Sequence, residues 1–152
     1  MKFEIEQIAL YPRDPVAAKE LLAAMGAVDW AEDHVVATGH VRGATGTNEA
    51  DLSFNYDLLD KARELEVLHY TAGPNWMMGG APRVSHLGTH CTEEELDFWL
   101  EFFENWNIPI AQAVHTKSHT NPNIPGKRKW RYVIFDTYSI LGVDIKFIVR
   151  IE

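Results

Sequence analysis

The sequence of 152 residues contains a single cysteine, Cys91, so an internal disulfide bond is excluded. We expect this cysteine to be a buried and unreactive thiol. No apolar run is long enough to cross a bilayer. The N-terminus also lacks the basic segment followed by an apolar run that is typical of a signal peptide. We therefore expect a soluble, cytoplasmic protein.

Positive charge is scarce, because 14 lysines and arginines stand against 22 aspartates and glutamates, and the net charge is −8. A surface of this sign disfavours nucleic acids and anionic membranes as partners. The one basic run, Lys127-Arg128-Lys129, is short and is expected to lie in a solvated loop.

The glycine-rich segment 39–48 is followed by a strand pattern and not by a helix, so it is interpreted as a mobile lid or a connection and not as a phosphate loop.

A strand that runs into a helix occurs twice in the chain. In the segment 84–91, His86, Gly88 and His90 alternate with apolar or small residues, so the two histidines point to one face of a strand. Thr92 and the glutamate three residues later then form a capping box that opens a helix. In the segment 2–11 the same alternation places Gln7 on one face, and Asp14-Pro15 provides the helix start.

Both halves of the sequence follow the same order of strand, helix and three further strands, which indicates an α+β protein. Gln7 and Glu66 are 59 positions apart, and His86 and Lys146 are 60 positions apart. We place the modules at residues 1–78 and 79–152, with the boundary near Gly79, and expect them to share one structural domain. The predicted strands cover 2–11, 33–38, 50–57 and 64–71 in the first module and 84–91, 110–116, 130–136 and 142–150 in the second. The predicted helices begin at Pro15, with an apolar stripe of Val16, Leu21, Leu22 and Met25, and after Thr92, with a stripe of Leu96, Trp99, Phe102, Phe103 and Trp106; the segment 117–129 is expected to be a loop.

This pattern resembles the vicinal-oxygen-chelate superfamily, which includes the glyoxalases, the bleomycin-resistance proteins and the extradiol dioxygenases. The resemblance covers nearly the whole chain in its order of elements. It is closest in the segments 7–15, 66–70 and 86–88. It implies two βαβββ modules that form a curved mixed sheet around a cavity, and it implies a homodimer.

The resemblance also implies a metal site, whose ligands would be Gln7, Glu66 and His86. The fourth position holds Lys146, where the catalytic members of the superfamily usually have glutamate. An ammonium group has no lone pair to offer a cation. Two states therefore stay open at almost equal weight. Either the three ligands bind a divalent ion such as Zn, Ni, Mn or Fe, and Lys146 contacts an anionic group of the substrate, or Lys146 pairs with Glu66 and replaces the metal.

A register shift of two residues would keep the face of the last strand and bring Asp144 into the fourth position. Asp144 aligns better with Glu64 of the first module.

His90 is a candidate general base, although a strand-end histidine beside a helix start is the simpler interpretation. His115 and Tyr70 are candidate substrate-binding residues, although a surface histidine and a packed tyrosine are more common.

Two functions from different classes follow from these residues. The first is a metal-dependent lyase or isomerase of the glyoxalase type, acting on a small carbonyl or oxygenated substrate, in which Glu66 or His90 moves the proton. The second is a non-catalytic protein of the bleomycin-resistance type, which binds a small molecule and has a degenerate metal site. A third possibility is a protein that keeps only the fold and serves a structural or interaction role.

Overall fold

The computed structural model describes residues 1–60, 63–74 and 85–152, and the expected module boundary near Gly79 lies outside these ranges. The predicted strands and helices occur in the predicted order, and β7, β8 and α4 are additional. No helix in the described part of the chain is long and apolar enough to cross a membrane. The strands are β1 (Gln7–Leu10), β2 (Ala31–Val41), β3 (Ala44–Asn55), β4 (Glu64–Ala72), β5 (His86–His90), β6 (Ile110–Thr116), β7 (His119–Asn121), β8 (Ile124–Arg128), β9 (Trp130–Phe135) and β10 (Asp144–Arg150). The helices are α1 (Pro15–Ala24), α3 (Glu93–Asn105) and α4 (Tyr138–Leu141).

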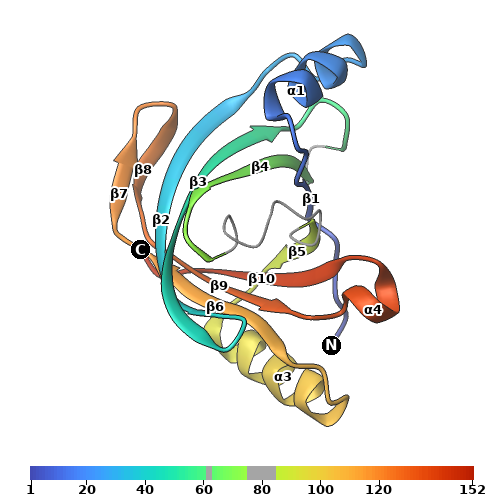
Figure 1. Ribbon diagram of the computed structural model, residues 1–152, viewed down its shortest axis with the longest axis vertical. Helices are drawn as coiled ribbons and strands as arrows, with labels where there is room; N and C mark the ends of the chain where they lie inside the picture. The colour runs from blue at the N-terminus through green and yellow to red at the C-terminus, as the bar shows by residue number, and fades with distance from the viewer. Residues whose placement is uncertain (61–62, 75–84) are drawn as a thin grey trace.

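Eight strands form one closed barrel in the order β1-β4-β3-β2-β6-β9-β10-β5, and Figure 1 looks into the ring that they make. Strand β1 runs parallel to β4, and β5 runs parallel to β10 in the same way. The two modules meet through two antiparallel pairs, β1 with β5 and β2 with β6. The expected pair of βαβββ modules and the curved mixed sheet are therefore confirmed.

The segment 39–48 is not the loop that the sequence indicated. Strands β2 and β3 continue through it and pair up to Val41 and Ala44. Only Arg42 and Gly43 form the turn, and both have positive φ, 47° and 82°. Two positive φ values in a two-residue connection are typical of a tight hairpin turn that matches the twist of its strands. Apart from Gly43 in the turn, the glycines and threonines of this segment belong to strands, so the segment is a hairpin and not a loop.

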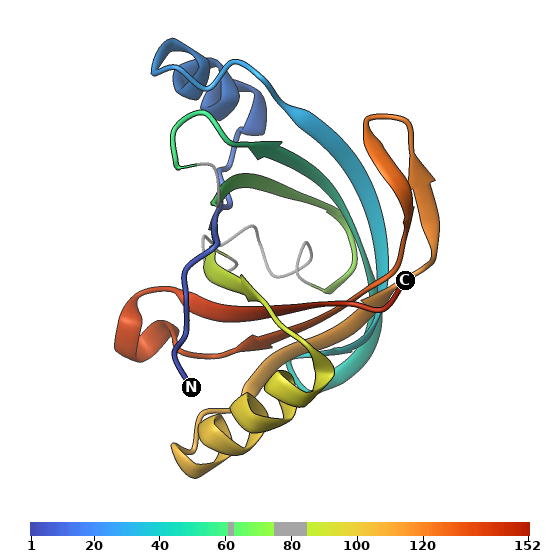
Figure 2. The ribbon, with the colours of Figure 1, turned by 180° about the vertical axis from the view of Figure 1, so that it is seen from behind.

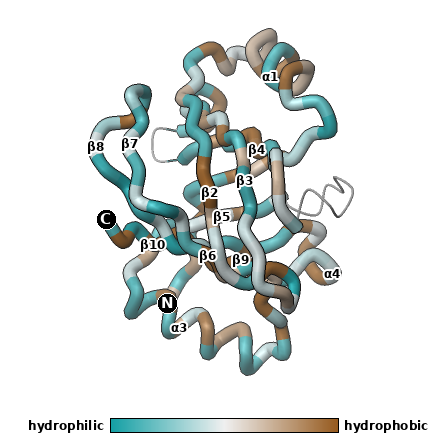
Figure 3. The backbone as a smooth tube through the Cα atoms, turned by 60° about the vertical axis from the view of Figure 1, so that its left-hand side comes forward, coloured by the Kyte–Doolittle hydropathy of each residue, from teal (hydrophilic) through white to brown (hydrophobic). Residues whose placement is uncertain are grey.

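The segment 117–129 also differs from the expected loop. Strands β7 and β8 form a separate two-stranded hairpin, inserted between β6 and β9. Figure 1 and its reverse view in Figure 2 both place this hairpin beside β2, outside the ring of strands. Figure 3 shows that most of its length is hydrophilic. The first module contains no counterpart of this hairpin among its described residues.

Helix α3 closes the outer face of the second module. Thr92 forms the predicted capping box with Glu95, and the helix buries Leu96, Trp99 and Phe103. These side chains pack on the odd-numbered residues of β10 and on β9. The Phe103 and Phe135 rings are stacked with their centroids 4.2 Å apart.

Cys91 lies half-buried at the edge of this cluster, where burial and nearby carboxylates raise the pKa of its thiol to about 11.

Helix α1 begins as predicted, because the Asp14 carboxylate accepts a hydrogen bond of 3.0 Å from the backbone N–H of Ala17. Its expected apolar stripe is not a core face, since the helix contains no buried residue. Val16 and Leu21 are 67% and 65% exposed. The helix therefore lies on the barrel without the close packing that the second module achieves.

Side chains alternate between the inside and the outside of the barrel, as the pleat of a strand requires. In β10, Ile145, Phe147 and Val149 face outward to α3, whereas Lys146 and Ile148 face inward. The same alternation in the other strands directs acids, amides and aromatic rings to the interior. The barrel interior is therefore where a functional site is expected.

Candidate functional site

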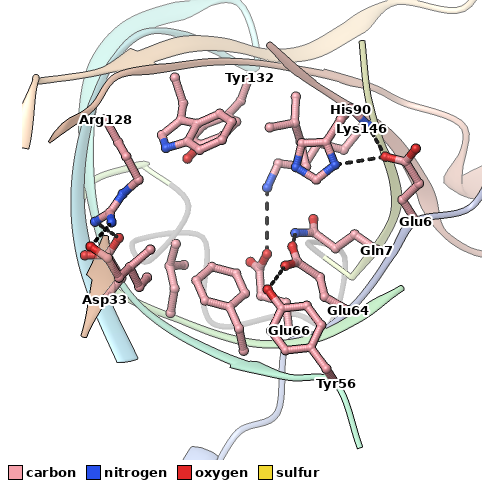
Figure 4. Close-up of a pocket in the computed structure, with 15 residues that line it drawn as sticks. Glu6, Gln7, Asp33, Tyr56, Glu64, Glu66, His90, Arg128, Tyr132 and Lys146 are labelled. Carbon is pink, nitrogen blue, oxygen red and sulfur yellow. Dashed lines mark hydrogen bonds and ion pairs between the residues drawn. The ribbon is translucent and has the colours of Figure 1, made fainter. Parts of the chain in front are cut away.

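The barrel interior contains a cavity of about 330 Å³, which falls in the range of small-molecule pockets. Figure 4 shows the side chains of both modules pointing into it. Its apolar lining consists of Leu52, Phe54, Ile124, Trp130, Tyr132 and Ile148. Its polar lining includes Gln7, Glu64, Glu66 and Lys146 at one side and Asp33 with Arg128 at another. The cavity therefore combines aromatic walls with a few fixed polar groups.

Lys146 and Glu66 face each other across the barrel, with Lys146 Nζ 4.0 Å from Glu66 Oε2. The side chains are 9% and 1% exposed, so both charges are withdrawn from water. Lys146 Nζ also lies 4.5 Å from the centroid of the Tyr132 ring, an arrangement that stabilises a cation. Burial raises the pKa of Glu66, and the Lys146 ammonium opposes this increase. The other carboxylate oxygen, Oε1, has no hydrogen-bond partner among the described residues.

Gln7 connects both modules through a chain of hydrogen bonds. Its Oε1 lies 2.8 Å from His86 Nε2, and its Nε2 donates to Glu64 Oε1. The second Glu64 oxygen accepts a hydrogen bond of 2.7 Å from the Tyr56 hydroxyl. Burial and the Glu64 carboxylate raise the pKa of Tyr56, so this hydroxyl keeps its proton and acts as a donor. The amide of Gln7 is therefore fixed in orientation at the cavity wall.

These residues do not fit a divalent metal ion. Gln7 Oε1 and His86 Nε2 are hydrogen-bonded to each other, so the two atoms expected to coordinate a cation are already occupied. Lys146 brings a positive charge to within 4.0 Å of the only carboxylate of the set. Within the described ranges, no group of three or more histidine, cysteine, aspartate or glutamate side chains is arranged to hold a metal. Of the two states left open by the sequence, the geometry favours the one in which Lys146 takes the place of the metal.

The other predicted residues are not all brought to the cavity. His90 lines it, and His90 Nδ1 lies 2.9 Å from Glu6 Oε2. Tyr70 is buried and lines a smaller chamber behind the Lys146–Glu66 pair. His86 is 1% exposed and contacts the site through Gln7. His115 is the exception: it is exposed and does not line the cavity, because Val114 and Thr116 on either side of it face inward.

The alternative that Asp144 takes the fourth position is not supported by the register. Asp144 pairs with His86 just as Glu64 pairs with Gln7, so Asp144 is the counterpart of Glu64 and Lys146 is the counterpart of Glu66. Asp144 is 2% exposed and does not line the cavity. Burial, and after it the Asp136 carboxylate, raises the pKa of Asp144 to about 6.

Arg128 and Asp33 are site residues that the sequence analysis missed. Arg128 was expected in a solvated loop, but it is 4% exposed. Its Nη2 donates to Asp33 Oδ2 at 3.2 Å and lies 3.3 Å from His119 Nε2, while Nη1 donates to the backbone oxygen of Ile124. These contacts fix the β7–β8 hairpin to β2 and make the hairpin a wall of the cavity. The run of three basic residues 127–129 has no alternation of polar and apolar side chains that could have indicated an inward-facing residue.

No protein-family model matches the sequence, and no curated protein matches it. Solved structures do match. Methylmalonyl-CoA epimerase from Mycobacterium tuberculosis superposes with a TM-score of 0.50 and 8% identity, over 98% of this chain and 91% of the epimerase chain. The chain shares its fold with this epimerase.

Two further structures agree with this assignment of the fold. A variant of the Streptomyces coelicolor epimerase, in complex with 2-nitronate-propionyl-CoA, gives a TM-score of 0.50 and 11% identity over the full length of both chains. A hypothetical protein from Bacillus halodurans gives 0.52 and 10%, over 98% of this chain and 95% of its own. The glyoxalase-like fold expected from the resemblance is therefore confirmed, and identities this low carry the likeness no further than the fold.

Proposed function

We propose that this protein is a member of the vicinal-oxygen-chelate superfamily that binds a small organic molecule in the barrel cavity without a metal ion. The observation that carries the proposal is the Lys146–Glu66 pair, which lies at the two positions where the resemblance implies metal ligands. Two opposite charges at this separation attract by about 4 kcal/mol at an effective dielectric near 20. An incoming cation would have to break this attraction and then face the ammonium group.

The lining of the cavity supports a ligand with a flat apolar body and an oxygen group. Phe54, Trp130 and Tyr132 offer ring faces and edges. Lys146 offers N–H donors to a carbonyl or carboxylate oxygen, and it does so from a site with little access to water. The S. coelicolor epimerase variant was solved with a CoA derivative, which shows that a protein with this fold accommodates an organic ligand. A homodimer, as the resemblance implies, and the cytoplasmic location expected from the sequence are part of this proposal.

The test is to restore the missing carboxylate with Lys146→Glu and to measure Zn, Ni and Mn binding by isothermal titration calorimetry. We expect the wild type to bind none of these ions with a Kd below about 1 mM. The variant should bind at least one of them about a hundredfold more tightly, a gain of about 2.7 kcal/mol. The gain is expected because the variant removes the ammonium and offers two carboxylates to a cation, which can then compete for the imidazole and the amide that are otherwise hydrogen-bonded to each other.

Two matched variants separate the site from a general charge effect. Lys117→Glu makes the same charge change at an exposed position and should leave metal binding unchanged. Lys146→Met removes the ammonium but adds no ligand, so it should gain less affinity than Lys146→Glu. Tight metal binding by the wild type, equal to that of the Lys146→Glu variant, would contradict the proposal.

A second candidate function is proton transfer by Glu66 without a metal. It is favoured by the unpartnered Glu66 Oε1 at the cavity wall and by the raised pKa of this carboxyl group, which makes it a stronger base once it is ionised. The test is exchange of α-protons of small carbonyl compounds in deuterium oxide, followed by NMR. Exchange that is faster with the wild type than with Glu66→Gln or without protein would support this function. Equal rates in all three samples would leave binding as the function.

A further inference from the structure

A second, smaller chamber of about 30 Å³ lies inside the barrel. It shares Leu52, Glu66, Tyr132 and Lys146 with the main cavity, so the two spaces meet at the Lys146–Glu66 pair. Its own lining is mostly apolar and well buried. The two spaces are therefore neighbours inside the barrel, with the Lys146–Glu66 pair between them.

Asn48 is the unusual residue of this chamber. It lies on β3 next to a β-bulge at Glu49 and Ala50, and it is 2% exposed. Neither its side-chain oxygen nor its side-chain nitrogen has a hydrogen-bond partner in the part of the chain that the structure describes. A Cβ built on Gly73 would lie 2.5 Å from Asn48 Oδ1, so the amide is held closely by the neighbouring backbone.

A buried amide with both polar atoms unsatisfied is rare in folded proteins, because each unpaired group loses its hydrogen bonds to water and gains nothing in return. Where such groups occur, they point to a partner that the protein chain does not supply. An asparagine amide presents one acceptor and one donor side by side. Its complement is a planar group that has a donor next to an acceptor.

We propose that the inner chamber is a subsite for a primary amide of the bound molecule, with Asn48 as the residue that selects it. The inference rests on the proposed binding function and adds the chemical class of the ligand. The apolar body of the molecule lies in the main cavity. Its planar end passes the Lys146–Glu66 pair and forms paired hydrogen bonds with Asn48 Oδ1 and Nδ2.

The experiment uses phenylalkyl primary amides of increasing chain length, each paired with the methyl ketone of the same shape. The ketone keeps the acceptor and lacks the donor. Isothermal titration calorimetry with the full-length protein should show, for the amide of the matching length, about tenfold tighter binding than for its ketone. Asn48→Leu, a change of similar size, should reduce this ratio to about twofold or less. Asn105→Leu, at an exposed position of α3, should leave the ratio unchanged.

A crystal structure of the wild type with the preferred amide provides a measurement that does not depend on a variant. The amide of the probe should lie within hydrogen-bond distance of both polar atoms of Asn48. A water molecule at Asn48 with the probe elsewhere would overturn the inference, and so would equal binding of amides and ketones. Failure of every probe to bind the wild type would overturn the proposed function as well, so the two failures are distinguishable.

Discussion

The two modules have the same topology but differ in how they use it. In the second module, α3 packs three buried side chains onto β9 and β10, and an aromatic cluster fills the space between them. In the first module, α1 buries no residue, and its apolar side chains remain exposed. A duplicated architecture therefore does not imply a duplicated core, and the second module supplies more of the packing that holds the barrel together.

The same divergence appears at the cavity. Gln7 is the counterpart of His86, and Glu66 is the counterpart of Lys146, as the equivalent registers of β1 with β4 and of β5 with β10 show. The first module provides the buried carboxylate of Glu66, and the second provides the buried ammonium group of Lys146. The pair can form because these two equivalent positions carry side chains of opposite charge.

The largest expected effect is a contrast between the two helices. Phe103→Ala should lower the free energy of unfolding by about 3 to 4 kcal/mol, because it leaves a cavity between α3, Phe135 and Phe147. Leu21→Ala on α1 should change it by less than about 0.5 kcal/mol, since this side chain is already exposed. Urea unfolding followed by tryptophan fluorescence measures both. Similar losses for the two variants would show that the modules contribute equally to stability.

The next effect concerns the opposite charges in the cavity. Glu66→Leu alone should destabilise the protein by about 3 kcal/mol, because it leaves the Lys146 ammonium buried without its partner. The double variant Glu66→Leu with Lys146→Met should recover most of this loss, since no buried charge remains.

A double-mutant cycle in urea at pH 7 measures the coupling between the two positions. We expect a coupling energy of about 2 kcal/mol. Strictly additive losses would mean that the two charges do not stabilise each other, and they would remove the main support for the metal-free site.

The smallest effect distinguishes the two remaining counterparts, Glu64 and Asp144. The pKa of Asp144 in the folded protein is raised to about 6, so the folded state holds this proton more strongly than the unfolded chain does. Ionised Asp144 therefore costs stability above about pH 6, and this cost disappears below about pH 4, where both states are protonated. Asp144→Asn should raise the free energy of unfolding at pH 8 by about 1 kcal/mol, because the buried amide that replaces the carboxylate offsets part of the roughly 3 kcal/mol that the pKa shift represents, and it should have little effect at pH 3.5.

Glu64→Gln is the matched change in the first module. It should destabilise the protein slightly at pH 8, because Glu64 accepts hydrogen bonds from Gln7 and Tyr56. Melting temperatures recorded across this pH range measure both variants. Effects of the same sign would contradict the contrast between Glu64, whose ionised form accepts hydrogen bonds from two side chains, and Asp144, whose ionised form is disfavoured by burial.

The order of elements could be predicted from the sequence because it depends on local patterns. Alternation identified the inward face of β10, and caps identified the starts of α1 and α3. The Lys146–Glu66 pair followed from counting positions along two similar halves, once the resemblance had indicated which strands face the cavity. These features are determined by residues that are near one another in sequence or related by one repeat.

Other features depend on tertiary contacts that no local pattern reveals. The glycines and threonines of 39–48 favour a loop by composition, but pairing with β6 extends β2 through that segment. Arg128 lies in a basic run that is typical of a solvated surface, but Asp33, which lies 95 positions away, holds it in the barrel wall. Asn48 gave no signal, since one asparagine in a polar segment is ordinary until its burial is known.

The β7–β8 hairpin has a consequence for how this protein acquires new ligands. Its two strands pair with each other and with no barrel strand in the described ranges, yet it contributes Ile124 and Arg128 to the cavity wall. Insertions, deletions or recombination within 120–127, which keep the buried Arg128–Asp33 pair, would reshape the pocket while leaving all eight barrel strands in register. Residues of this hairpin can therefore change which ligand is bound without changing the strand pairing that forms the barrel.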